Sequence, residues 1–124
     1  MKEISRISEA EWEVMEVFWR RSPRTAAEVY AVLLSDTQWK KTTVRTLISR
    51  LLAKGILRHE VDGKRYLYSA ARSRDECVEA ASQSFLERIF GGSVQPLLLH
   101  FASRTRLSKS NAEKLKQLLE GTKS

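Results

Sequence analysis

Hydroxyl and basic side chains recur along one side of segment 41–54, with no carboxylate among them. At helical spacing, that side carries Thr42, Arg45, Thr46, Ser49 and Arg50. An ordinary solvated helix mixes acidic with basic residues, because opposite charges three or four positions apart support each other. A face rich in hydrogen-bond donors and free of carboxylates suits phosphate groups and the edges of guanine bases. The pattern therefore indicates contact with DNA.

Most of the charge of the chain is concentrated around this face. The 124 residues carry a formal net charge of +7, and segment 38–65 alone carries +6. The basic residues of that segment are Lys40, Lys41, Arg45, Arg50, Lys54, Arg58, Lys64 and Arg65. A basic balance favours a polyanionic partner, either nucleic acid or an acidic membrane surface.

The residues give little support for catalysis, metal binding or disulfide formation. Paired carboxylates, a nucleophile with a neighbouring base, a phosphate-cradling glycine loop and metal-ligand spacing are all lacking, so we predict no enzymatic activity and no cofactor or metal. The single cysteine, Cys77, excludes an intrachain disulfide and is interpreted as a packed thiol. His59 is interpreted as a half-buried packing residue opposite Tyr66.

The chain also lacks the features of an exported or membrane protein. Its start, residues 1–6, has no apolar signal-peptide core. No apolar run approaches the ~18 residues that cross a bilayer. We therefore expect a cytoplasmic protein without membrane insertion.

The segments before and around the basic face have helical periodicity. Capping boxes at Ser8–Glu11 and Thr25–Glu28 predict helices over about 9–21 and from 25 to about 35. The second helix is expected to face inward with Ala26, Val29, Tyr30, Leu33 and Leu34. In the third, over about 41–54, an apolar stripe lies opposite the basic face and consists of Val44, Leu47, Ile48, Leu51 and Leu52.

After Gly55, which is expected to cap the third helix, the pattern changes to alternation. Segments 57–61 and 64–68 are strand-like and are joined by Asp62-Gly63, which predicts a hairpin with a type I′ turn. Two short strands are not stable alone, so the hairpin must pack on the helices. The order predicts a mainly α protein: a winged helix-turn-helix of three helices and a β-hairpin wing, followed by a helical dimerisation region.

Residues 73–124 form that second region. They show three amphipathic helices, over about 73–90, 93–102 and from 108, with no globular core of their own. A second copy of the chain would cover them, which predicts a homodimer; the alternative is that they fold back on the first domain. We assign 1–72 to DNA binding and 73–124 to dimerisation, through Phe85, Ile89, Leu98, Phe101, Leu115, Leu118 and Leu119.

Several stretches resemble the BlaI/MecI/CopY family of bacterial penicillinase repressors. They are 7–15, 43–51, Lys54-Gly55, 90–92, 97–101 and Leu107-Ser108, which together span nearly the whole chain. The resemblance implies a dimeric repressor of transcription that binds an inverted-repeat operator in double-stranded DNA, and it implies control of β-lactam or cell-wall stress genes. It places the DNA contacts on the third helix and the wing, at Lys41, Thr42, Thr43, Arg45, Thr46, Arg50, Lys64 and Arg65.

Three positions depart from the family pattern. The copper-responsive branch has paired cysteines in its tail, and residues 111–124 have none. The β-lactam-responsive branch is cut between Asn and Phe by a membrane-bound sensor protease; the corresponding pair here resembles His100-Phe101. Before the third helix, Lys40-Lys41 replaces the usual Ser-Pro.

A second function stays open from the residues alone. Winged helices also serve as protein–protein adaptors or antirepressors without direct DNA binding. Such domains usually lose the basic face, whereas this chain keeps it.

Overall fold

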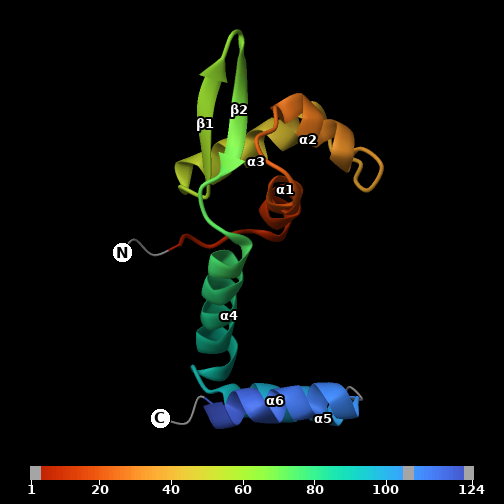
Figure 1. Ribbon diagram of the computed structural model, residues 1–124, viewed down its shortest axis with the longest axis vertical. Coiled ribbons are helices and arrows are strands. Elements are labelled where there is room, and N and C mark those ends of the chain that lie inside the picture. The colour runs from red at the N-terminus through yellow and green to blue at the C-terminus, as the bar shows by residue number, and fades with distance from the viewer. Residues whose placement is uncertain (1–3, 105–107, 122–124) are drawn as a thin grey trace. The chain divides into compact units, whose positions relative to one another are not determined.

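The computed structural model describes residues 4–104 and 108–121 of the chain (Figure 1). Its elements are α1 (Glu9–Arg20), α2 (Ala26–Leu33), α3 (Lys41–Ala53), β1 (Leu57–Asp62), β2 (Arg65–Ala70), α4 (Arg74–Phe90), α5 (Val94–Arg104) and α6 (Lys109–Gly121). The chain divides into two compact units, Met1–Ser82 and Gln83–Ser124. No helix in the described part combines the length and the apolar character that a membrane span requires.

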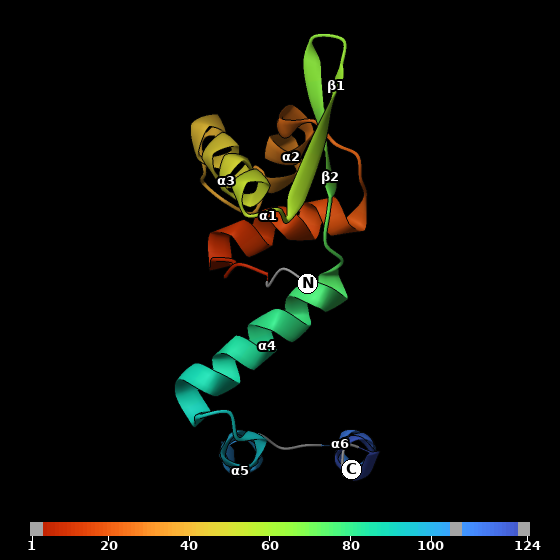
Figure 2. The same cartoon turned by 90° about the vertical axis from the view of Figure 1, so that its left-hand side faces the viewer.

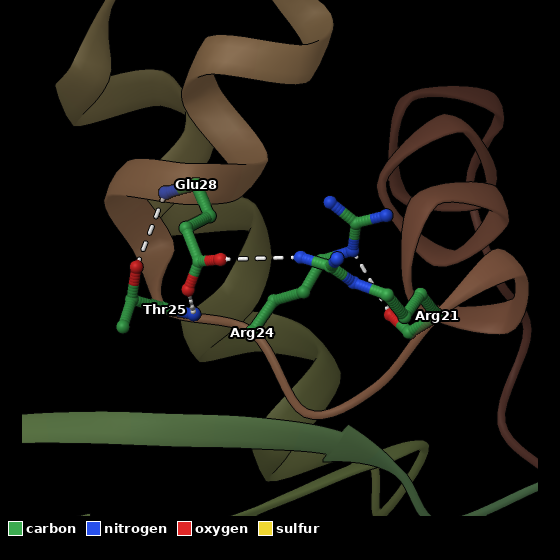
Figure 3. A network of polar contacts seen from close by, with 4 residues as sticks. All are labelled: Arg21, Arg24, Thr25 and Glu28. Carbon is green, nitrogen blue, oxygen red and sulfur yellow. Dashed lines mark hydrogen bonds and ion pairs between the residues drawn. The ribbon is translucent and has the colours of Figure 1, made fainter.

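Both predicted capping boxes are present. The Ser8 hydroxyl accepts from the Glu11 N–H at 3.1 Å, and the Glu11 carboxylate accepts from the Ser8 N–H at 2.8 Å. Thr25 and Glu28 make the same reciprocal pair at the start of α2 (Figure 3). Arg21 also donates to Glu28 at 3.4 Å. These caps fix where α1 and α2 begin, and each contributes about 1 kcal/mol.

The core of the first unit lies between α1, α2, α3 and the base of the hairpin. The predicted stripe on α3 is buried at Val44, Leu47, Ile48 and Leu51, while Leu52 is partly buried against the same core. The polar residues on the opposite side of α3 are all exposed, as is typical of an amphipathic helix at the surface.

The prediction that Leu34 faces inward from α2 was wrong. The helix stops at Leu33, and Leu34, expected inside, is 54% exposed. The Thr37 N–H and hydroxyl both donate to the Leu33 carbonyl, at 2.9 and 3.0 Å. Leu34 still has helical φ and ψ, so its side chain lies about 100° around the helix axis from Leu33 and faces away from the side that buries Val29 and Leu33.

Gly55 ends α3 as predicted and turns the chain into the hairpin. Its N–H donates to the Leu52 carbonyl and the Ile56 N–H donates to the Leu51 carbonyl, each at 3.0 Å, which is a Schellman motif. The motif requires a left-handed residue, and Gly55 has φ +76°. Ile56 is consequently fully buried against the end of α3.

The turn of the hairpin differs from the predicted one. Asp62 pairs with Arg65, so the two-residue turn is Gly63-Lys64 rather than Asp62-Gly63. A type I′ turn needs positive φ at both central residues. Gly63 has φ +66°, but no other residue type among the described residues has positive φ, so Lys64 cannot supply the second. Glycine in the first central position is typical of a type II′ turn.

The shifted register also changes which aromatic residues face each other. His59 lies opposite Tyr68, not opposite Tyr66 as predicted. It is exposed rather than half-buried, and its ring centroid lies 5.2 Å from that of Tyr66 and 6.1 Å from that of Tyr68. Within the described residues, no three potential metal ligands come together.

The start of α4 belongs to the first unit and is packed there. Cys77 is 1% exposed, as expected for a packed thiol. Burial, with the charge of Glu76, raises the pKa of this thiol. The Trp19 indole N–H donates to the Arg72 carbonyl at 2.9 Å, and Arg74 pairs with Glu16 at 2.9 Å, so α1 holds the beginning of α4.

The second unit carries exposed apolar residues on helices. Phe85 is 41% exposed, Ile89 58% and Phe101 51%, while Leu98 is partly buried. The predicted dimerisation residues Leu115, Leu118 and Leu119 belong to α6, but their side chains lie outside the described residues.

Candidate nucleic-acid interface

The outer side of α3 gathers six of the eight predicted DNA-contact residues. All six are exposed, and α3 contains no acidic residue; they are Lys41, Thr42, Thr43, Arg45, Thr46 and Arg50. The hairpin lies beside α3 in the same unit (Figure 2). Two basic elements therefore stand next to each other.

The N-terminus of α3 offers unused donors. Its N-cap residue, Lys40, makes no side-chain capping bond, and the first helical bond runs from the Val44 N–H to the Lys40 carbonyl. Lys41 lies over the ring of Tyr30, with 5.7 Å from its Nζ to the ring centroid. Free N–H groups, the positive end of the helix dipole and a nearby ammonium group together favour an anion such as phosphate.

The hydroxyls of the outer side are not all free donors. Thr46 Oγ1 donates to the Thr42 carbonyl at 2.9 Å. A hydroxyl has a single hydrogen, so Thr46 is left with its acceptor lone pairs and its methyl group. Its expected role as a donor is therefore weakened, and the cationic donors of this side are Lys41, Arg45 and Arg50.

The two predicted wing residues differ in their surroundings. Lys64 stands in the turn and is exposed. Arg65 opens β2 and donates to Asp62 at 3.2 Å through Nε and 3.0 Å through Nη2. Both partners are more than half exposed, and such surface pairs are weak enough for a phosphate to compete.

Two hollows flank α3. A groove of about 440 Å³ runs between the start of α2, α3 and the hairpin; it is lined by Thr25, Ala26, Ala27, Arg45, Ile48, Ser49, Lys64, Arg65, Tyr66 and Tyr68. A second hollow, of about 260 Å³, is lined by Thr42, Thr43, Thr46, Leu47 and Arg50. The structure thus brings Arg45 together with both wing residues and leaves Arg50 on the other side of the helix.

One basic residue of the charged segment does not belong to this surface. Lys54 Nζ lies 2.6 Å from Glu11 Oε1 and donates to the Arg6 carbonyl at 2.6 Å. Burial of Glu11 works to raise its pKa, but hydrogen bonds from Lys54 and Ser8 outweigh burial and hold the pKa below its usual value. Lys54 therefore ties the end of α3 to the start of α1.

Sequence reasoning missed this pair for a definite reason. The capping box already gave Glu11 a local partner, and a second partner 43 positions away leaves no periodic signal. It also missed Tyr30 and Tyr66 as neighbours of the basic residues. The sequence predicts Tyr66 on the hairpin, but opposite His59 rather than opposite Val61.

Three helices with a β-hairpin beside the exposed side of α3 define a winged helix-turn-helix protein, which confirms the predicted fold class. The chain belongs to the penicillinase repressor family, whose model matches residues 7–121. This is a family of transcriptional repressors, not of enzymes.

Relatives and a solved structure agree with this assignment. The chain is 35% identical over 120 residues to the penicillinase repressor of Bacillus licheniformis, covering 97% of this chain and 94% of that protein. It is 30% identical over 113 residues to the methicillin resistance regulatory protein MecI of Mammaliicoccus sciuri, covering 91% and 92%. It also resembles the solution structure of monomeric Bacillus licheniformis BlaI in complex with the blaP half-operator. That match has 36% identity and a TM-score of 0.53, over 61% of this chain and 93% of that one.

Proposed function

We propose that this chain is a homodimeric, sequence-specific repressor of transcription that binds an inverted-repeat operator through α3 and the hairpin. The observation that carries the proposal is the outer side of α3: it is exposed, has no carboxylate and lies beside a second basic element. The BlaI relative whose structure includes a half-operator is consistent with it. A bacterial repressor acts where the chromosome lies, in the cytoplasm.

The basic residues would contact different parts of the DNA according to their position. Arg45 lies in the second turn of α3 and Arg50 in its last turn, and both are on the exposed side that would face the bases if α3 enters the major groove. A bidentate arginine–guanine contact contributes about 1–3 kcal/mol of discrimination. Lys41 at the helix start and the two wing residues Lys64 and Arg65 would contact phosphate. Thr42, Thr43 and Thr46 line the second hollow and would add short-range contacts.

Dimerisation would use residues 73–124, and DNA binding residues 1–72. Phe85, Ile89 and Phe101 are exposed apolar side chains on the helices of this region, and a second copy would cover them. A two-fold dimer presents two copies of α3 to successive major grooves, about one helical turn apart. The operator is therefore expected to be nearly palindromic.

Control by proteolysis is the finer part of the proposal. His100 and Phe101 lie in the middle of α5, both exposed. A membrane sensor protease would cut between them, which would damage the dimerisation region and release the operator. The relatives named for penicillinase and methicillin resistance support β-lactam or cell-wall stress genes as the targets. Incubation with a cognate sensor protease, followed by mass spectrometry, tests the cleavage position.

DNA binding is tested by selection and by one substitution. The parent chain is expected to enrich inverted repeats from a random duplex pool. Arg45→Ala should weaken binding to the selected duplex about tenfold or more without changing the melting temperature, because the side chain points away from the core. Arg20→Ala is the matched control, since Arg20 is an exposed arginine at the far end of α1. Equal affinity of Arg45→Ala and parent would refute the assignment. Lack of salt-sensitive binding to any duplex would instead favour an adaptor function.

A further inference from the structure

Tyr66 occupies an unusual position in the groove between the start of α2, α3 and the hairpin. It lines this groove together with Arg45 from α3 and with Lys64 and Arg65 from the hairpin. Its side chain is 52% exposed, although it is a large aromatic residue outside the apolar core. Packing of the core therefore does not explain why a tyrosine stands there.

The ring of Tyr66 is held in place by its neighbours on the hairpin. The His59 ring lies edge-on to it, with centroids 5.2 Å apart and an interplanar angle of 80°. Tyr68 lies two positions further along β2, and its ring centroid is 6.4 Å from that of Tyr66. Among the described residues, no hydrogen bond uses the Tyr66 hydroxyl. A fixed ring with a free hydroxyl loses little conformational entropy when it binds a partner.

The walls of the groove define the chemistry of its occupant. Three cationic side chains line it, and no carboxylate does. A helix that enters the major groove is bordered on both sides by sugar–phosphate strands, so an element flanking that helix meets backbone rather than base edges. Tyrosine hydroxyls are among the groups that bond to phosphate oxygens in protein–DNA contacts.

We propose that this groove receives the sugar–phosphate backbone of one DNA strand, and that the Tyr66 hydroxyl donates a hydrogen bond to a phosphate oxygen there. The inference rests on the proposed function and adds to it a neutral contact that no basic residue supplies. Lys64 and Arg65 attract and neutralise the phosphates along the strand, whereas the Tyr66 hydroxyl fixes the register of one phosphate against the hairpin.

The test is the salt dependence of binding to the duplex that the parent selects. Tyr66→Phe keeps the ring and its contacts but removes the hydroxyl. A lost hydrogen bond to a charged group should weaken affinity about tenfold. The slope of log K against log salt should stay unchanged, because a neutral hydroxyl releases no counterion. Lys64→Ala should instead reduce the slope by about 0.9.

The control is Ser5→Ala, which removes another exposed hydroxyl outside the groove and should leave affinity within about twofold of the parent. Parent-like affinity of Tyr66→Phe would overturn the inference. So would a slope that falls as in Lys64→Ala, since Tyr66 would then act only by positioning the hairpin, and so would an equal loss in Ser5→Ala. Failure of the parent to bind any duplex would refute the proposed function itself, and this inference with it.

Discussion

Replacing Lys54 by methionine should destabilise the first unit more than replacing any exposed lysine. Glu11 is 1% exposed, and its Oε2 has no hydrogen-bond partner among the described residues. Lys54→Met keeps the apolar stem but leaves this carboxylate with only the Ser8 N–H. Removal of one partner from a buried pair costs about 3–5 kcal/mol. Because the Lys54 side chain is 28% exposed, water can replace part of the contact, and we expect about 2–3 kcal/mol.

The stability lost in Lys54→Met should depend on pH in a defined direction. The folded-state pKa of Glu11 is below its usual value, so the ion pair contributes stability above the unfolded pKa of about 4.3 and loses it as the pH falls through the folded pKa. In Lys54→Met, burial without the ammonium group favours protonated Glu11. The difference in the free energy of unfolding between the parent and Lys54→Met should therefore be large at neutral pH and shrink below about pH 4.

Urea unfolding followed by the fluorescence of the three tryptophans measures this difference directly. Lys40→Met is the control, since Lys40 is exposed and makes no capping bond; it should change stability by less than about 0.5 kcal/mol. Two results would refute the reasoning. One is equal stability of Lys54→Met and parent at neutral pH, and the other is a deficit that stays constant from neutral pH to pH 3.

Three further outcomes follow from local geometry. Tyr30→Leu should weaken affinity for the selected duplex about two- to fourfold, because Lys41 loses the ring it lies over. Tyr30→Phe keeps the ring and should not weaken affinity, so equal affinities of the two variants in a titration would exclude the ring contact. Gly55→Ala should lower the free energy of unfolding by about 1–2 kcal/mol, because alanine is strained at φ +76°. No atom lies within 4 Å of the added Cβ, so backbone strain is the whole effect, and an unchanged urea midpoint would contradict this. Cys77 should react slowly with a thiol reagent at neutral pH in the native protein, because burial raises its pKa, and rapidly in urea; equal rates would show that the site opens freely.

The parts of the fold that depend on local pattern could be predicted from the sequence. Capping boxes, the stripe on α3 and the glycine cap at Gly55 each involve residues within a few positions of one another. The exposed, carboxylate-free side of α3 followed directly from its apolar stripe. These features determine the order of elements and the location of the candidate interface.

The details that failed depend on competing turns or on distant partners. Asp62-Gly63 and Gly63-Lys64 both fit a two-residue turn, and the choice between them moved His59 from Tyr66 to Tyr68. Sequence alone also gave Lys54 the same weight as the other basic residues, although Glu11, 43 positions away, holds it.

The central claim is that the outer side of α3 enters DNA, and a crystal structure of the full chain bound to its selected duplex measures this most directly. We predict that Arg45 and Arg50 lie within hydrogen-bond distance of the duplex in its major groove, with the hairpin over the adjacent backbone. A complex in which that side of α3 is covered by protein, while the DNA lies on another surface, would contradict the account.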